Sequence, residues 1–470
     1  MRILKPVLLY FVLVGLPGVG VLKVLEAGRQ LTGLPGTPGS VIPRAEALAM
    51  PNLARLLAQM VVILLLSRVI GRLFRKIHQP QVIGEMVAGI LLGPSLFGSL
   101  LPQLSALLFP ASSLGYLNSL SQVSVVLYMF LVGLGLDPHE LRKHRHIAFV
   151  ISHTSIIFPF LLGTLLALYL YPRLSEGPGS FIHFSLFLGT AMSVTAFPVL
   201  ARIVTDRNLA QTKVGVVAIA CAAVDDVTAW CMLAAVVLLV KAAAAPLPMW
   251  IMLVGCASYI LVMFFGVRPG LARLAARRDL RGTGTTDVLA MVVLLALASG
   301  WVTELLGIHA LFGAFLMGVM MPKNSRLAGS LAERLEPLTT VVLLPLFFAF
   351  TGLRASVGLL SEPAMWFYTV LILLVAVSGK FGASMLCTRL SGMSWRESSA
   401  IGTLMNTRGL MELIVLNVGL DVGAISRTVF TMMVLMALVT TFMASPLLEW
   451  CYPQHVRSKR IVLPAAAESV

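Results

Sequence analysis

The sequence predicts an all-α polytopic membrane protein, and three observations support this fold class. Its 470 residues are 58% hydrophobic and only 12% charged, and the mean hydropathy is +0.93, far more apolar than a soluble domain of average composition. Apolar stretches of about 20 residues, long enough to cross a bilayer as a helix, recur along most of the chain. Lys and Arg residues cluster between these stretches, as in the cytoplasmic loops of membrane proteins.

We expect about thirteen membrane-spanning helices. They cover approximately residues 53–71, 81–98, 120–136, 147–171, 182–205, 214–240, 250–267, 286–305, 309–321, 337–353, 364–388, 398–420 and 427–449. A further apolar run, Val7 to Leu22, is predicted to be either a signal peptide or an extra helix, because no clear A-x-A cleavage site follows it. The predicted organisation is an N-terminal hydrophobic segment and external loop (1–52), a transmembrane domain (53–450) and a short tail (451–470).

The distribution of positive charge predicts the orientation of the chain. Alternate loops carry clusters of Lys and Arg, whereas the loops between them, from Ser99 onward, hold only Arg173, Lys241, Arg354 and Arg427. Because Lys and Arg concentrate in cytoplasmic loops, the clustered set and the C-terminus are predicted to be cytoplasmic. We expect the membrane to be the inner membrane of a bacterial cell.

Composition also argues against other classes of partner. The formal net charge is +15, but no basic stripe with interleaved aromatic residues is present, so nucleic acid is not an expected partner. The five cysteines show no C-x-x-C spacing, which argues against a metal site or a disulfide framework. No cofactor is expected.

The thirteen stretches divide into two sets of six around the one at 250–267. An odd central helix gives the two sets opposite topology, and such inverted repeats are typical of secondary transporters. The fifth helix of each set is predicted to be broken near mid-depth. In "GTAMSVTAFPVLARI", Pro198 removes a backbone donor and clashes with the preceding turn. In "GTLMNTRGLMELI", the apolar run is interrupted by Asn406, Thr407, Arg408 and Gly409.

Either interruption alone is consistent with an ordinary kink, since Pro and Gly are common in membrane helices. Two interruptions at the same position of two repeats point to a binding site.

Two adjacent aspartates, Asp225 and Asp226, are the only ionisable residues between Val214 and Val240. At 1.5 Å rise per residue they lie roughly 17 to 22 Å from the ends of this helix, near the midplane. An isolated carboxylate at that depth is costly unless it takes up a proton or finds a partner. Neighbouring helical residues diverge by about 100°, so the two side chains need different partners.

Lys380 in "SGKFGAS" is a candidate partner for one of the aspartates. It lies about 14 Å from the cytoplasmic end of its helix, a long distance for a snorkelling lysine. Gly379 and Gly382 beside it are predicted to allow close helix approach. The other carboxylate would either be protonated or bind a cation, and these states exclude each other. Such competition is the chemistry of a cation/proton antiporter.

Other polar groups near the breaks complete the predicted site. Oxygens around Ser193, Thr195 and Ala196 are candidates for completing a shell around a cation. Arg408 and Glu412, four residues apart, are predicted to form a structural ion pair that holds the second break, and direct cation binding by Glu412 is the alternative. Glu85 and His309 also lie near apolar segments. A functional role is one interpretation of each. A satisfied polar residue or an interfacial cap is an interpretation at least as good.

Five strings carry a resemblance to a known family. They are "QPQVIGEMVAGILLGPSLFG", "TAMSVTAFPVLARIV", "AAVDDVTAW", "IHALFGAFLMGVMMP" and "MNTRGLMELIVLNVGL". Over roughly Leu53 to Trp450 the sequence resembles the monovalent cation:proton antiporters of the second cation/proton antiporter family, close to the plant cation/proton exchangers.

The resemblance implies a homodimer of thirteen-helix subunits, in which a six-helix core with crossed broken helices moves by an elevator-like step against a dimerisation domain. It implies that Asp226 is the essential ion-carrying aspartate, Asp225 its neighbour and Lys380 the lysine that pairs with Asp225. The substrates would be Na⁺ or K⁺ and H⁺.

Two alternatives remain. A glutathione-gated potassium efflux system is one, although only 20 residues follow Trp450 and no attached regulatory domain is expected. An intramembrane aspartyl protease is the other, but it needs carboxylates from different helices to share a water.

Overall fold

The computed structural model describes residues 16–27, 52–77, 79–135, 145–175, 180–209, 212–242, 249–279, 285–306, 309–322 and 326–453. Throughout these ranges every regular element is a helix, which confirms the predicted all-α class. Ten helical segments in them are long and apolar enough to cross a membrane, and two shorter apolar helices cover 289–305 and 310–320. The protein is therefore an integral membrane protein.

The helices follow one another with short connections. In the first half they are α2 (Leu16–Ala27), α3 (Asn52–Lys76), α4 (Gln81–Leu92), α5 (Phe97–Leu100), α6 (Pro102–Leu108), α7 (Ala111–Gly135), α9 (Arg145–Leu174), α10 (Phe181–Ser193), α11 (Phe197–Asp206) and α12 (Lys213–Ala242).

The second half also contains short π-helical and 3₁₀ segments, labelled η. The elements are α13 (Met249–Val262), η3 (Met263–Val267), α14 (Arg268–Asp279), α15 (Thr285–Leu305), α16 (Ala310–Met320), α17 (Arg326–Leu338), η4 (Thr339–Leu343), α18 (Leu344–Arg354), η5 (Val357–Leu360), α19 (Pro363–Val377), η6 (Ser378–Gly382), α20 (Ala383–Leu390), α21 (Trp395–Met405), α22 (Leu410–Asp421) and α23 (Arg427–Cys451).

Each predicted stretch coincides with a helix or a pair of helices, but several helices extend beyond the apolar residues. The basic segment after Val267, predicted to be a loop, is helix α14, which continues α13 through the π-helical turn η3. Arg, Ala and Leu are strong helix formers, so backbone propensity carries the helix past the end of the apolar run. Likewise α17 begins well before the predicted stretch at 337–353.

The predicted N-terminal segment lies partly within the described residues. From Leu16 onward its apolar run is helical, and in α2 the side chains of Val21 and Val24 are buried. A Cβ added at Gly20 would lie 3.0 Å from the Leu161 side chain, so α2 packs closely against α9. Residues 1–15 and the predicted external loop at 28–51 lie outside the described part of the chain.

The helices pack in two groups. The flanking group contains α3 to α7 and α13 to α18, and the crossing group contains α9 to α12 and α19 to α23; helices pack mainly within their own group. In the flanking group, Gly89 of α4 lies directly against the Ala349 carbonyl of α18, and Gly318 of α16 against the Phe130 carbonyl of α7. Only glycine permits such close approach of two backbones.

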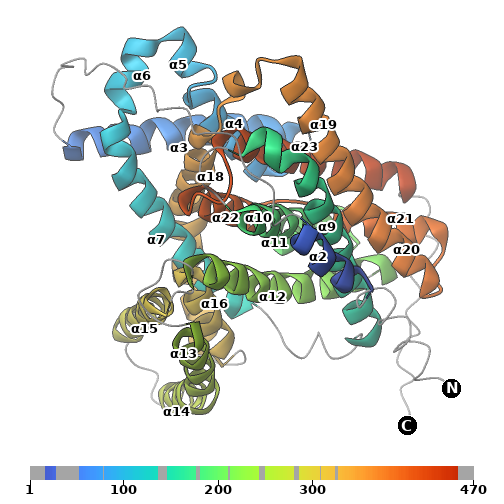
Figure 1. Ribbon diagram of the computed structural model, residues 1–470. Coiled ribbons are helices and arrows are strands. Elements are labelled where there is room, and N and C mark those ends of the chain that lie inside the picture. Colours follow the sequence, from blue (N-terminus) through green and yellow to red (C-terminus); the bar gives the residue numbers. More distant parts are fainter. Residues whose placement is uncertain are drawn as a thin grey trace.

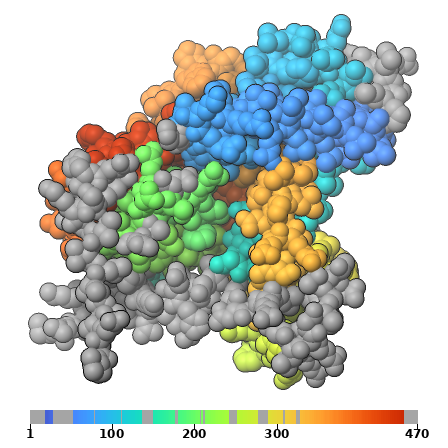
Figure 2. All heavy atoms as spheres, turned by 180° about the vertical axis from the view of Figure 1, so that it is seen from behind, coloured from blue at the N-terminus to red at the C-terminus, as the bar shows by residue number. Residues whose placement is uncertain are grey.

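The figures show this arrangement. Figure 1 shows α10, α11 and α22 near the centre of the molecule, with α13 to α16 together at the lower left. Seen from behind, α3 and α4 in blue lie across the upper part, and the green α11–α12 region and the gold α17 region lie below on opposite sides (Figure 2).

Both predicted helix breaks are present at the centre of the crossing group. Helix α10 ends at Ser193 and α11 begins at Phe197, with Pro198 in its first turn, where a missing N–H costs nothing. Helix α21 ends at Met405 and α22 begins at Leu410. The two breaks touch, because the Ala196 N–H donates a hydrogen bond of 3.0 Å to the Thr407 carbonyl.

Candidate ion-binding site

Asp225 is held by four side chains from three other segments. Ser152 Oγ donates to Oδ1 at 2.5 Å, Ser155 Oγ to Oδ2 at 3.0 Å and Thr195 Oγ1 to Oδ2 at 2.6 Å. Lys380 Nζ lies 2.9 Å from Oδ2, and neither charged side chain is exposed. The contact predicted between Lys380 and an aspartate is therefore present, and its partner is Asp225, as the family resemblance implies.

Lys380 is oriented by the π-helical turn η6, a rare conformation that is frequent at functional sites. Its ammonium also donates to the carbonyls of Ser155 at 2.9 Å and Ser193 at 2.5 Å, so it points inward and does not snorkel. Of the two glycines predicted to allow close packing here, only Gly379 does so. A Cβ added there would lie 3.0 Å from the Pro159 Cα of α9, whereas one at Gly382 would meet nothing within 4 Å.

Asp226 has opposite surroundings, although it is the next residue in α12. Its side chain is buried, with 1% relative exposure. Within the described residues its Oδ1 atom has no hydrogen-bond donor. A buried carboxylate without donors is unfavourable as a bare anion, so Asp226 is suited to bind a proton or a cation.

Arg408 contacts the first break more closely than it contacts Glu412. Its Nη1 atom donates to the carbonyls of Ala191 and Val194, both at 2.9 Å, and its Nη2 atom to that of Met192 at 2.7 Å. Its Nε atom lies 3.8 Å from Glu412 Oε2, within ion-pair range but beyond hydrogen-bond distance. Arg408 thus holds the break mainly through backbone carbonyls, and the expected pair with Glu412 is the weaker contact.

Two cationic side chains therefore cover the C-terminal end of α10. The last four carbonyls of a helix have no partner within the helix and carry the negative end of its dipole. Here those carbonyls belong to residues 191–194, and they accept hydrogen bonds from Arg408 and Lys380. The negative end of this half-helix is thereby neutralised from within the protein.

The C-terminal end of α21 has different partners. The Met405 carbonyl accepts from Thr195 Oγ1 at 3.1 Å, the Leu404 carbonyl from Thr407 N–H at 3.2 Å, and the Gly402 carbonyl from Asn406 N–H at 3.1 Å. In these contacts only neutral groups donate. Thr195 bridges the two halves of the site, because the same hydroxyl lies within hydrogen-bond distance of Asp225 and of the second break.

The region where the α10–α11 break meets the α21–α22 break is the crossing. The remaining predicted residues are buried around it. Asn406 is 3% exposed, and its Oδ1 atom lacks a hydrogen-bond partner in the described structure. The carboxylate oxygens of Glu412 likewise accept no hydrogen bond from the described residues. The Ser193 hydroxyl donates to its own helix at Gly189, and Ala196 is buried beside Thr407.

Sequence reasoning missed three residues of this network. Ser152 and Ser155 of α9 lie three residues apart and so share a helix face, which is the one signal in the sequence. That signal is weak because serines in membrane helices usually bond to their own backbone. Thr441 of α23 lies 3.0 Å from the Arg408 amide and 2.9 Å from its carbonyl, and so fixes the backbone of the second break.

Glu85 and His309 lie outside the crossing. Glu85 is buried and accepts a hydrogen bond of 2.8 Å from Gln81. His309 is the N-cap of α16, in agreement with the interpretation of a cap.

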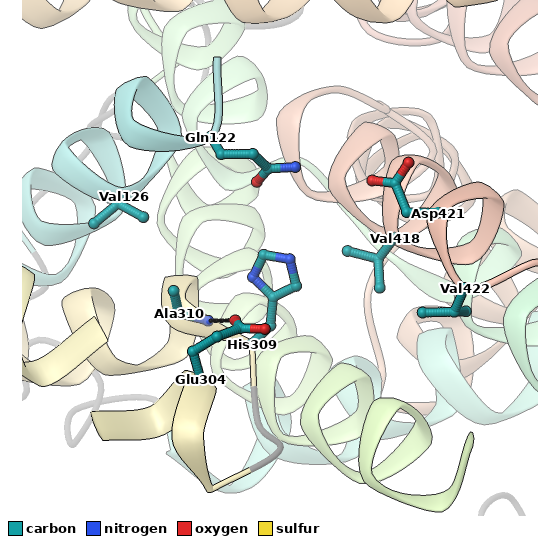
Figure 3. Close-up of a pocket in the computed structure, with 8 residues that line it drawn as sticks. All are labelled: Gln122, Val126, Glu304, His309, Ala310, Val418, Asp421 and Val422. Atoms are coloured by element: carbon teal, nitrogen blue, oxygen red, sulfur yellow. Dashed lines mark hydrogen bonds between the residues drawn. The ribbon is translucent and has the colours of Figure 1, made fainter. Parts of the chain in front are cut away.

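A separate cavity of about 400 Å³, lined by both polar and apolar side chains, lies between α7, the α15–α16 connection and α22. Figure 3 shows the His309 ring in this cavity, with Gln122, Glu304 and Asp421 around it. Helix α22 of the crossing group contributes Val418 and Asp421 to its lining, but none of the predicted site residues at the two breaks lines it.

A protein-family model matches most of this chain. Residues 61–450 match the family model described as sodium/hydrogen exchanger, transmembrane. The Na⁺/H⁺ antiporter NhaS4 of Synechocystis sp. is 42% identical over 407 residues, which cover 86% of this chain and 98% of that protein.

Eukaryotic relatives are also similar. Cation/H⁺ antiporter 17 of Arabidopsis thaliana is 40% identical over 84% of this chain and 48% of its own length. K⁺/H⁺ antiporter 1 of Saccharomyces cerevisiae is 35% identical over 85% of this chain and 47% of its own. This chain thus spans about half the length of these plant and yeast relatives.

Among solved structures, the sodium proton antiporter MjNhaP1 of Methanocaldococcus jannaschii superposes with a TM-score of 0.65, covering 87% of this chain and 99% of that one. At 13% identity this similarity supports the fold alone. From the family match over residues 61–450 and its relatives, the chain belongs to the transmembrane sodium/hydrogen exchanger family, a family of monovalent cation:proton antiporters.

Proposed function

We propose that the protein exchanges Na⁺ or K⁺ for H⁺ across a membrane, with Asp226 as the residue that binds the cation and the proton alternately. The observation that carries this proposal is the contrast between two adjacent carboxylates. Asp225 is saturated by hydrogen bonds and an ammonium, whereas Asp226 is equally buried and its Oδ1 atom is without a donor in the described residues.

The charges at the crossing favour exchange of one monovalent ion for another. The buried ionisable residues there are the carboxylates Asp225, Asp226 and Glu412 and the cations Lys380 and Arg408. Lys380 pairs with Asp225 and Arg408 lies opposite Glu412, so among the described residues Asp226 is the carboxylate of this set that has no cationic partner. One proton or one monovalent cation at Asp226 neutralises that carboxylate, and a low-dielectric interior penalises any state that leaves it charged.

The helix packing supports an elevator-like mechanism. We propose that the crossing group is the moving core and that the flanking group stays in place, since the helices of each group pack mainly with one another. In this proposal the chain has thirteen spans in two inverted sets of six, with the broken pairs α10–α11 and α21–α22 at equivalent positions. Movement of the crossing group would carry Asp226 between the two sides of the membrane.

The remaining features of the proposal follow from sequence and family. We propose a homodimer in a bacterial inner membrane, with residues 53–450 as the transport domain, 1–52 as an N-terminal hydrophobic segment with an external loop, and 451–470 as a cytoplasmic tail. The names of the relatives include both Na⁺/H⁺ and K⁺/H⁺ antiporters, so either cation is a candidate.

Two other functions are less well supported. A glutathione-gated potassium efflux system would use the same site, but no observation favours such gating. The family assignment makes the chain a transporter and not an enzyme. Both aspartates also project from one helix, where they cannot converge on one water as a protease requires.

The test is transport by purified protein in liposomes that contain a pH-sensitive dye. The vesicles are first made acidic inside. Na⁺ or K⁺ added outside should then exchange for internal protons and dequench the dye, whereas choline should not. An absence of response to every alkali cation, in vesicles that hold a proton gradient, would refute the proposal.

A further inference from the structure

We infer that the exchangeable cation binds at the C-terminal end of α21, with the side-chain oxygen of Asn406 as a ligand beside Asp226. This inference rests on the proposed function and adds the location of the cation and a ligand from the second break.

Helix dipoles at the crossing favour a cation at α21. The C-terminal ends of the two half-helices α10 and α21 both lie at the crossing, and each carries the negative end of a helix dipole, which favours a cation. At α10 this position is filled, since Arg408 and Lys380 together donate to the carbonyls of residues 191–194. At α21 the contacts come from Thr195, Thr407 and the Asn406 backbone, which are neutral. A cation entering the crossing is therefore attracted to α21.

Asn406 and Asp226 each carry a free side-chain oxygen. In the described structure Asn406 Oδ1 and Asp226 Oδ1 are both buried acceptors that receive no hydrogen bond. Buried polar atoms are nearly always satisfied, so free oxygens on two segments that Thr195 joins are candidate cation ligands. Amide and carboxylate oxygens are suitable ligands for hard alkali cations, which coordinate oxygen as other hard cations do.

A hydroxyl bridge connects the segments that carry these two residues. Thr195 Oγ1 lies 2.6 Å from Asp225 Oδ2 and 3.1 Å from the Met405 carbonyl, so it joins α12 to the end of α21. Asp226 follows Asp225 and Asn406 follows Met405, so the two residues that carry free oxygens belong to the two segments that this bridge joins. The first break offers less, because the Ser193 carbonyl and the Thr195 hydroxyl are already used by Lys380 and Asp225.

The experiment compares three variants with the wild type in the same liposome assay. Asn406→Leu removes the oxygen with little change in volume, and Asn406→Asp replaces the amide with a carboxylate. Asn417→Leu is the matched control, since Asn417 is an equally buried amide one helical segment away whose atoms all have partners: Arg354, Thr351 and the Leu413 carbonyl.

We expect Asn406→Leu to raise the half-saturating cation concentration about tenfold or more, the size seen when a supporting group of a metal site is lost. Asn406→Asp should lower it at alkaline pH, because a second carboxylate faces the cation. Asn417→Leu should lower the melting temperature and leave the half-saturating concentration unchanged. Cation-dependent thermal stabilisation of the purified protein, which needs no transport, should follow the same order.

Unchanged cation affinity in Asn406→Leu, or an equal loss in Asn417→Leu, would overturn the inference while leaving the proposed function intact. If Asn406→Leu does not fold, Asn406→Asp decides: an affinity equal to that of the wild type at alkaline pH overturns it. A wild type without any cation-dependent proton flux would instead contradict the proposed function.

Discussion

Asp225 and Asp226 are adjacent in α12, yet one carboxylate is fully bonded and the other retains a free oxygen. Asp225 accepts hydrogen bonds from Ser152, Ser155 and Thr195 and pairs with Lys380 at 2.9 Å. Asp226 Oδ1 has no donor among the residues that the structure describes. Because neighbouring helical residues point about 100° apart, one helix presents two carboxylates to different surroundings.

Asp226→Asn should abolish cation-dependent proton flux and leave the protein folded. The amide keeps the volume of the side chain but can neither release a proton nor neutralise a cation. Flux in liposomes reports the activity, and monodisperse elution with an unchanged or raised melting temperature reports the fold. Retained flux in the purified variant would remove Asp226 from its proposed role.

Apparent cation affinity should rise with pH. If proton and cation compete for Asp226, acid fills the site with protons and more cation is needed for half-saturation; alkali empties the site and less is needed. Transport measured at several pH values between about 6 and 9 gives this dependence. A half-saturating concentration that stays flat across the series, with only the maximal rate changing, would argue against competition.

Lys380→Gln should destabilise the protein, and Asp225→Asn in the same background should recover part of the loss. Removing the ammonium leaves a buried carboxylate without its counter-charge, and breaking a buried pair costs about 3 to 5 kcal/mol. Neutralising Asp225 removes that penalty. A double-mutant cycle on thermal melting measures the coupling, and a coupling energy of zero would mean that the 2.9 Å contact has no energetic weight.

Arg408→Lys should be destabilising although it keeps the charge. One ammonium cannot reproduce the planar fork that donates to three carbonyls at the end of α10. A buried acceptor left without a partner costs about 1 to 3 kcal/mol, so we expect a loss of at least that size. Arg207→Lys is the control, because its pair with Glu449 is partly exposed and such pairs contribute about 0 to 1 kcal/mol. Equal melting temperatures for the two variants would show that Arg408 is not needed to cap α10.

The sequence by itself determined the fold class, the approximate helix positions and both helix breaks. These are local properties: a bilayer requires about 20 apolar residues per span, Pro198 cannot continue a helix hydrogen-bond ladder, and a run of polar residues interrupts an apolar helix. Even here the predicted end of the helix at Val267 was wrong, because the chain continues as α14. Hydropathy marks the membrane boundary, whereas backbone propensity marks the end of the helix.

The residues alone left open which aspartate Lys380 contacts, and the family resemblance implied Asp225. Only the tertiary structure brings that pair together, decides which carbonyls Arg408 binds and shows that Ser152 and Ser155 take part. These contacts join residues far apart in the chain, 155 positions for Lys380 and Asp225 and 217 for Arg408 and Ala191. Periodicity shows that a side chain is buried but not what it meets, since the partner depends on how α9, α10 and α12 rotate and approach. The free oxygen of Asp226 depends in the same way on where the donors of the surrounding helices lie.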